Sequence, residues 1–172
     1  MTDIRPASQP DAEPICAIYN HYVASTTISF EEAPVSAAAM AARIADVTNG
    51  GLPWLVLEVD GVVAGYAYAT KWRARPAYRH AVESSVYLDP ALAGRGHGRR
   101  LYTRLLDELR IRGLHTAIAG IAQPNERSIG LHERLGFRKV AHFGEVGFKF
   151  GRWIDVGYWQ LLLDPPAHVA TG

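Results

Sequence analysis

Three alternating glycines at the start of a helical pattern are the first feature of the sequence that could do chemistry. Gly94, Gly96 and Gly98 follow the apolar segment Val86–Leu88 and precede a strongly amphipathic run that begins at Arg99. Glycine has no Cβ, so such a loop turns sharply and lets a ligand approach the main chain closely. The free N–H groups of the loop and first helical turn, together with the helix dipole, favour an anion. The segment therefore predicts a cradle for a phosphate group.

The spacing of these glycines excludes two common phosphate-binding motifs. A P-loop requires G-x-x-x-x-G-K-[ST], and no such run follows the glycines. A dinucleotide fingerprint counted from Gly94 would need glycine or alanine where Arg99 stands, and one counted from Gly96 would need it at Leu101. A tight strand-to-helix turn without a ligand is the alternative reading. The segments downstream have to decide between a cradle and a simple turn.

The length of the chain, 172 residues, predicts one domain that is large enough to bury its own core. The 18 basic and 17 acidic residues nearly balance, which gives no footprint for nucleic acid or an acidic membrane surface. Cys16 is the only cysteine, and the N-terminal segment lacks signal-peptide features, so we expect a cytoplasmic protein. No apolar run approaches the length needed to span a bilayer. We expect residues 1–163 to form the domain and residues 164–172 to be a flexible tail.

Hydrophobic periodicity and turn residues predict the elements that must position the cradle. The first part of the chain should form a strand around Ile4, a helix capped by Asp11, an extended segment Thr26–Phe30 and a helix from Ser36 to about Val47. A hairpin of Trp54–Val59 and Val62–Thr70, which turns at Asp60-Gly61, and a strand His80–Leu88 should follow. After them we expect the cradle, a helix ended by Gly113, a strand Thr116–Ala122, a helix Asn125–Leu135, and strands Phe137–Phe148 and Trp153–Leu162. Only one strand–helix–strand crossover is clear. The order therefore favours a mixed α+β fold over a doubly wound sheet.

Two motifs in the second half of the chain resemble the GCN5-related N-acetyltransferase (GNAT) superfamily. The family's cradle motif, Q/R-x-x-G-x-G/A, falls on residues 93–98, where both glycines match and Ala93 departs from the pattern. The second family block, N-x-x-[AS]-x-x-L-[YH]-x-x-x-G-F, is matched at the right spacing by Asn125, Ser128, Leu131, His132, Gly136 and Phe137. The resemblance implies a single GNAT domain with a central, mostly antiparallel mixed sheet flanked by helices.

Further blocks resemble the phosphinothricin and methionine sulfone (sulfoximine) acetyltransferase branch of that superfamily. These blocks, spread over nearly the whole chain, are SFEE at 29–32, WRARPAY at 72–78, VESSVYL at 82–88, IGLHERLGF at 129–137 and GRWIDVGYWQ at 151–160. Members of the branch transfer acetyl from acetyl-CoA to the α-amine of small acidic or polar amino-acid analogues, usually as homodimers. The resemblance thus implies acetyl-CoA as co-substrate, no metal, a small amine as partner and a homodimer.

The resemblance also assigns residues to the coenzyme. The main-chain N–H groups of 94–99 would face the pyrophosphate, and the backbone of 86–88 would pair with the pantetheine arm. The implied cofactor-binding residues are Val86, Tyr87, Leu88, Gly94, Arg95, Gly96, His97, Gly98, Arg99, Asn125 and Ser128. Asn125 follows Pro124 and could instead be a plain helix N-cap. Because Ala93 departs from the motif, we expect the backbone rather than a side chain to carry the binding.

Acetyl transfer to an amine requires a base. An amine with a pKa of about 10 is neutral in only roughly one of 10³ molecules at pH 7, so its proton must be removed. Glu83 is the candidate, and strand alternation places it on one face with Ser85 and Tyr87; a solvated carboxylate is the alternative. His132 stands where many GNAT members place a tyrosine that protonates the departing thiolate. A structural or solvated histidine is the alternative for His132.

An acidic amino-acid acceptor also needs cations and a walled pocket. The substrate-binding candidates are Phe30, Arg73, Arg75, Tyr78 and Ser85. Arg75 is the first choice for the substrate carboxylate or phosphinyl group, because a guanidinium binds such anions in a bidentate manner. An exposed basic loop is the alternative.

The sequence thus predicts a small-molecule N-acetyltransferase that works by direct transfer in a ternary complex. One alternative is an enzyme that acetylates a peptide or protein N-terminus, which would call for an open groove. Another is a non-catalytic CoA-binding module, which should lack the base Glu83. A covalent route through Cys16 is less favoured than a buried, inert thiol at that position.

Overall fold

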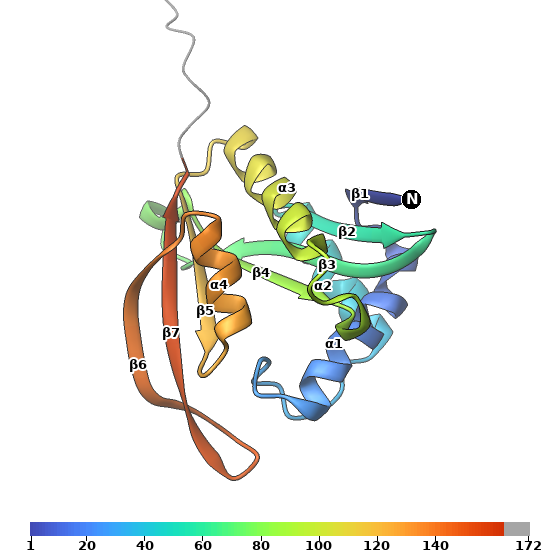
Figure 1. The fold of residues 1–172 in the computed structure, drawn as a ribbon. Coiled ribbons are helices and arrows are strands. Elements are labelled where there is room, and N and C mark those ends of the chain that lie inside the picture. Colours follow the sequence, from blue (N-terminus) through green and yellow to red (C-terminus); the bar gives the residue numbers. More distant parts are fainter. Residues whose placement is uncertain (164–172) are drawn as a thin grey trace, which may run out of the picture.

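The computed structural model describes residues 1–163, which form one seven-stranded sheet with helices on both faces (Figure 1). The elements are β1 (Thr2–Pro6), η1 (Gln9–Asp11), α1 (Ala12–Ser25), α2 (Ala37–Asn49), β2 (Trp54–Val59), β3 (Val62–Lys71), η2 (Pro76–Tyr78), β4 (Ala81–Leu88), η3 (Pro90–Leu92), α3 (His97–Ile111), β5 (Thr116–Ala122), α4 (Glu126–Arg134), β6 (Arg138–Lys149) and β7 (Arg152–Leu162). The flexible tail expected at residues 164–172 lies outside the described residues.

The sheet is mixed and mostly antiparallel, as predicted. Its strand order is β1-β2-β3-β4-β5-β7-β6, and β4–β5 is the parallel pair. The remaining neighbours, from β1–β2 to β6–β7, pair antiparallel. The parallel pair is joined by the crossover that carries the glycine cradle and α3, so the fold places the cradle beside the centre of the sheet.

Strand alternation divides the core between the two faces of the sheet. On β2, Trp54 and Val56 belong to the cluster under α1 and α2, whereas Leu55 and Leu57 belong to the cluster under α3. All four side chains are buried, which is the pattern expected of a strand covered by helices on both sides. The apolar stripe of α3 completes the second cluster with Leu101, Tyr102, Leu105, Leu106 and Leu109.

The hairpin prediction is confirmed, but the prediction of an extended segment at Thr26–Phe30 is wrong. Asp60 and Gly61 both have positive φ (52° and 81°), as the predicted two-residue turn requires. Residues 26–30 form an irregular loop between α1 and α2. Thr26 Oγ1 donates to Tyr22 O (2.7 Å) and accepts from Ile28 N (3.2 Å). These local bonds compete with strand pairing, so a β-branched run does not become a strand here.

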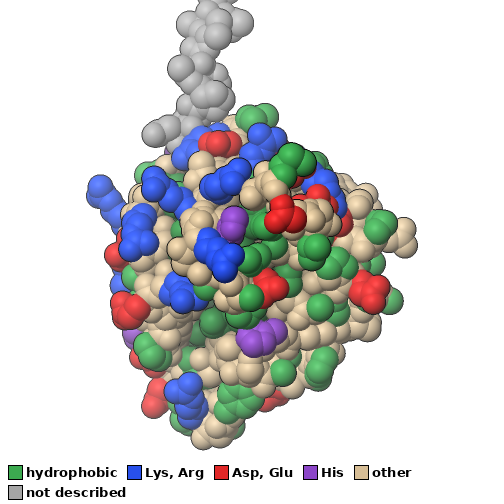
Figure 2. Space-filling model, turned by 45° about the vertical axis from the view of Figure 1, so that its right-hand side comes forward, with side chains coloured by type: hydrophobic (Ala, Val, Ile, Leu, Met, Phe, Trp, Pro, Cys, Tyr) green, Lys and Arg blue, Asp and Glu red, His purple; other side chains and the backbone are tan. Residues whose placement is uncertain are grey.

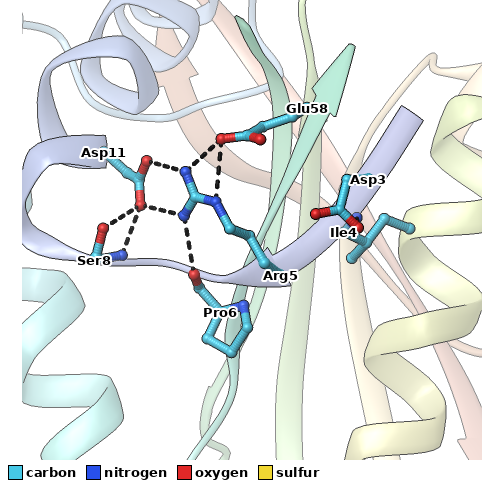
Figure 3. Close-up of polar contacts among 7 residues, drawn as sticks. All are labelled: Asp3, Ile4, Arg5, Pro6, Ser8, Asp11 and Glu58. Carbon is cyan, nitrogen blue, oxygen red and sulfur yellow. Dashed lines mark hydrogen bonds and ion pairs between the residues drawn. The ribbon is translucent and has the colours of Figure 1, made fainter. Parts of the chain in front are cut away.

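An ion cluster fixes the N-terminal strand to the sheet and to α1 (Figure 3). The Arg5 guanidinium donates to both carboxylate oxygens of Asp11 at 2.8 Å and, through Nε, to Glu58 Oε1 at 3.1 Å. Asp11 is buried and also accepts from Ser8 N (2.7 Å). The Arg5 hydrogen bonds, against the cost of burial, lower the pKa of Asp11 to about 2. β1, η1 and β2 are thereby joined through the Arg5 guanidinium, which binds the carboxylates of Asp11 and Glu58.

On the face drawn in Figure 2, basic side chains gather in the upper left part, whereas acidic side chains are scattered. Exposed large apolar side chains concentrate instead on the β6–β7 hairpin. They are Val140, Phe143, Val146, Phe148, Phe150, Trp153 and Leu162. Within residues 1–163, none of the helices is both long enough and apolar enough to cross a bilayer.

Candidate active site

The two central strands separate directly after Glu83. The parallel register of β4 and β5 contains three pairs and ends at Glu83–Ile118. Beyond that point β4 continues to Leu88 paired only with β3, and β5 continues to Ala122 paired with β7. A pocket opens between the diverging strands, lined by Ile28, Ser84, Ser85, Val86, Tyr87, Ala119, Gly120, Ile121, Ala122, Asn125, Ser128 and His132. Six predicted site residues therefore meet in this pocket, at 85–87, 125, 128 and 132.

Glu83 lies at the point where the strands separate. Its Oε1 is 3.4 Å from the position that a Cβ on Gly120 would occupy, and a ring carbon of Tyr158 is 3.2 Å from the same position. Burial raises the pKa of the Glu83 carboxyl, and the charge of Arg73 partly opposes this shift. A carboxylate with a raised pKa is a stronger base than a solvated one, so the environment suits proton abstraction.

His132 enters the pocket from α4 as a buried ring, 3% exposed. Its Nδ1 lies 2.7 Å from the Ser128 carbonyl oxygen, so Nδ1–H donates and the neutral ring carries its lone pair on Nε2. The ring packs edge-to-face on Tyr102 and Phe137, at 5.0 and 5.1 Å between centroids. Burial lowers the pKa of His132, partly offset by the Ser128 carbonyl. Donation from Nε2 to a thiolate would therefore require a second proton on this ring.

The glycine cradle has the geometry of an anion site. Gly94 and Gly96 have φ of 81° and 80°, and no atom lies within 4 Å of a Cβ built on either. The first hydrogen bond of α3 runs from Arg100 N to Gly96 O, which leaves the N–H groups of 97–99 without partners inside the helix. His97 Nδ1 is buried without a hydrogen-bond partner among residues 1–163. These unused polar groups beside open glycines fit a phosphate-bearing ligand.

Asn125 is a helix N-cap, which is the alternative given from the sequence, and it also lines the pocket. It is the N-cap of α4, and its Oδ1 accepts from Ser128 N at 3.1 Å. Ser128 Oγ in turn lies 3.4 Å from His132 Nδ1. The cap thus orients the first turn of α4, and with it the carbonyl that holds the histidine.

The predicted substrate residues are not all brought together. Ser85 lines the pocket, and Arg73 is near enough to affect the Glu83 carboxyl while its guanidinium stacks on Trp72 at 4.5 Å. Phe30 lies on the α1–α2 loop and is 42% exposed. Arg75 and Tyr78 lie at the exposed η2 segment and do not belong to the pocket lining.

Seven residues at the pocket were not predicted from the sequence. Six of them line it, namely Ile28, Ser84, Ala119, Gly120, Ile121 and Ala122, and the Tyr158 ring lies against Gly120. Strand alternation puts Ser84 on the opposite face from Glu83, where its Oγ lies 2.8 Å from Tyr102 Oη. A glycine in the middle of an apolar strand was the available signal for Gly120, because such a residue often marks a close approach.

Comparison with known proteins shows the family to which the chain belongs. Residues 4–157 match the family model described as an acetyltransferase (GNAT) domain. The chain belongs to the GNAT acetyltransferase family. This acetyltransferase is 40% identical to a phosphinothricin N-acetyltransferase of Streptomyces viridochromogenes, over 96% of its own length and 90% of the relative.

Two further comparisons extend the likeness of this acetyltransferase. It is 43% identical to an L-methionine sulfoximine/L-methionine sulfone acetyltransferase of Salmonella typhimurium, with 95% of this chain and 96% of the relative covered. Its fold superposes on an acetyltransferase from Salmonella typhimurium, solved with its cofactor acetyl-CoA, with a TM-score of 0.92. That structure is 42% identical, and 99% of each chain is covered.

Proposed function

We propose that this GNAT enzyme transfers acetyl from acetyl-CoA to the α-amine of a small amino acid or analogue, of the phosphinothricin or methionine sulfone type, in one direct step. The observation that carries the proposal is the separation of β4 and β5 immediately beyond Glu83. This separation leaves the half-buried Glu83 carboxylate beside a pocket in which the facing edges of β4 and β5 lack a partner strand. The names of the relatives support the choice of acceptor.

The coenzyme would lie along the pocket between the cradle and Glu83. The N–H groups of 97–99 would bind its pyrophosphate, and the β4 backbone at Val86 and Tyr87 would pair with the pantetheine arm as a neighbouring strand does. At Leu88 the carbonyl already accepts a hydrogen bond from Tyr22 Oη (2.6 Å). Acetyl-CoA supplies the acetyl group, and the relative solved with it supports this assignment.

Glu83 would take the proton that the amine must lose. The amine nitrogen forms a bond to the acetyl carbon, the bond from that carbon to sulfur breaks with its electron pair leaving on sulfur, and the amine proton goes to the carboxylate. The thiolate is then protonated by His132 Nε2, when that ring carries its second proton. Gly120 leaves room beside the carboxylate, because a Cβ there would lie 3.4 Å from Glu83 Oε1.

The acceptor's own anionic group would be held by arginine. Arg73, near Glu83, would offer the first guanidinium group, while Arg75, Phe30 and Tyr78, which do not line the pocket, are proposed for the outer part of the acceptor site. Small acidic acceptors therefore fit better than a long peptide, which does not need these cations.

Thiol release from acetyl-CoA, measured against a panel of amino acids, phosphinothricin, methionine sulfone, methionine sulfoximine and short peptides, tests the proposal. We expect release with at least one small α-amino acid or analogue. Release only with peptides would indicate the N-terminal acetyltransferase instead. Binding of acetyl-CoA without release for any amine would indicate a non-catalytic module.

We also propose that the enzyme is a cytoplasmic homodimer. The exposed aromatic surface of the β6–β7 hairpin supports self-association, since large exposed apolar patches commonly mark interfaces. The single cysteine, Cys16, is buried as a free thiol whose Sγ contacts Val35 O at 2.8 Å, and this supports a reducing compartment.

A further inference from the structure

A buried lysine connects the end of β6 to the loop beside the pocket. Lys149 is 2% exposed, and its Nζ donates to Val23 O (2.8 Å) and Ser29 O (2.7 Å). Val23 is in the last turn of α1, where carbonyl groups lack partners within the helix and carry the negative end of its dipole. The ammonium group therefore joins a helix terminus and an irregular loop to a strand more than 100 residues away.

A second contact from the same strand holds the same loop. The ring of Phe30 packs on Gly147, so closely that a Cβ there would be 2.3 Å from Cε2 of that ring. A bulge directs β6 toward this contact: the register with β7 shifts between Phe143 and Gly147, and Glu145 has a φ of 54°. The bulged Glu145 N–H donates to Asp155 Oδ1 at 2.8 Å. Bulges of this kind re-aim the residues that follow them.

The loop held in this way contributes to the pocket. Ile28 lines it together with Ser85 and His132. The loop makes no strand pairs of its own, and Ser29 is instead fixed by Tyr19 Oη, 2.8 Å from its Oγ. The position of Ile28 and Phe30 therefore depends on bonds that reach the loop from α1 and from β6.

We propose that Lys149 and Gly147 of β6 position the 26–31 loop as the wall of the acceptor site, and so control the binding of the amine but not of acetyl-CoA. This inference rests on the proposed function. Lys149 is a positioning residue here, since it acts through Ser29 and the end of α1. The coenzyme contacts proposed above lie on β4, on residues 94–96, on α3 and at the start of α4, and none of them belongs to this loop.

The test compares KM for the amine with KM for acetyl-CoA in Lys149→Met and Gly147→Ala. We expect each variant to raise the amine KM by about tenfold, since small displacements of positioning groups are costly, and to leave the acetyl-CoA KM within about twofold. Gly147→Ala forces the Phe30 ring to move without removing a charge. If Lys149→Met does not fold, the KM values of Gly147→Ala therefore still test whether β6 controls amine binding through the loop.

Matched controls lie on the same strand. Lys139→Met makes the same change at an exposed lysine, and Gly144→Ala adds a Cβ where only Asp155 Oδ1, at 3.9 Å, is nearby. Both should behave as wild type. A folded Gly147→Ala with a wild-type amine KM, or with both KM values raised equally, would overturn the inference. A wild-type protein that acetylates no amine would instead defeat the proposed function.

Discussion

At the scale of single residues, the environment of Glu83 that favours catalysis disfavours the charged carboxylate. Burial raises the pKa of this group, so the folded protein holds its proton more tightly than the unfolded chain does. Above the unfolded pKa, the folded state therefore loses stability as pH rises toward the raised folded value. The burial that makes Glu83 a stronger base therefore lowers the free energy of unfolding at neutral pH.

We expect Glu83→Gln to reduce turnover by about 10² or more while the thermal midpoint at pH 8 stays equal to wild type or rises. In the wild type, the rate should increase with pH through the raised pKa of Glu83, because only the ionised carboxylate accepts a proton. Turnover from pH 6 to 9 and thermal denaturation check both effects. Near-full turnover across that range would remove Glu83 from the mechanism; Glu126→Gln, at an exposed position on α4, is the control.

His132→Phe should lower the rate of acetyl transfer by about tenfold or more while acetyl-CoA still binds. The pKa of this histidine lies below its ordinary 6.5, so its doubly protonated form, the one able to donate from Nε2, disappears as pH rises. If His132 is the acid, the variant loses the fall in rate that accompanies this deprotonation. Pre-steady-state rates and equilibrium binding of acetyl-CoA separate the two effects, and unchanged kinetics would contradict the role.

At the scale of elements, the cradle can be tested against a glycine of the same backbone conformation. Gly96 at the start of α3 and Gly113 after its end have φ of 80° and 70°, and both have open space around a built Cβ. Alanine should cost each position about 1 kcal/mol of strain. Only Gly96→Ala should also raise the acetyl-CoA KM, by about tenfold, because its Cβ stands where the coenzyme approaches. Equal acetyl-CoA KM values for the two variants would contradict the cradle.

The ion cluster of β1, η1 and β2 predicts a pH-dependent contribution to stability. The pKa of Asp11 is about 2 in the folded protein against 3.8 for the ordinary group, so its contribution is present above about pH 4 and is lost as pH falls toward 2. Asp11→Asn should lower the free energy of unfolding by about 1 to 2 kcal/mol at pH 7, since Arg5 is partly exposed. The exposed Asp46→Asn is the control for denaturant titrations at pH 7 and pH 3. A difference that does not shrink at pH 3 would contradict the ion pair as its cause.

Local elements could be predicted from the sequence, whereas the contacts that complete the site could not. The Asp60-Gly61 turn, the cradle and the face of β4 follow from neighbouring residues, because turn chemistry and strand alternation are local rules. Where β4 and β5 separate depends on pairing between distant segments. The contact of Lys149 with Val23 likewise joins residues 126 positions apart, and no periodicity encodes it. The prediction of an extended segment at Thr26–Phe30 was wrong because hydroxyl groups near a helix end bond to the local backbone.

At the scale of the whole molecule, the exposed β6–β7 surface predicts an interface between two copies. Phe148 and Trp153 pair across the strands with centroids 4.9 Å apart, and Trp153 is 61% exposed. The double variant Phe148→Ser, Trp153→Ser should sediment as a monomer with an unchanged far-ultraviolet circular dichroism spectrum. Val62→Ser, at an exposed apolar residue of β3, should leave the dimer intact. A wild-type monomer, or a dimeric double variant, would exclude this surface as the interface.

The separation of β4 from β5 also means that the sheet has an edge in its interior. An outer edge strand exposes unpaired N–H and C=O groups that can recruit other chains, and proteins usually have to protect it. Here α4, β5 and the α1–α2 loop line the pocket beside the unpaired edge of β4, so we expect a narrow, extended molecule to fit along it. Such a molecule would complete the backbone bonding that the fold leaves open, and would act while bound as an eighth strand joining the two halves of the sheet.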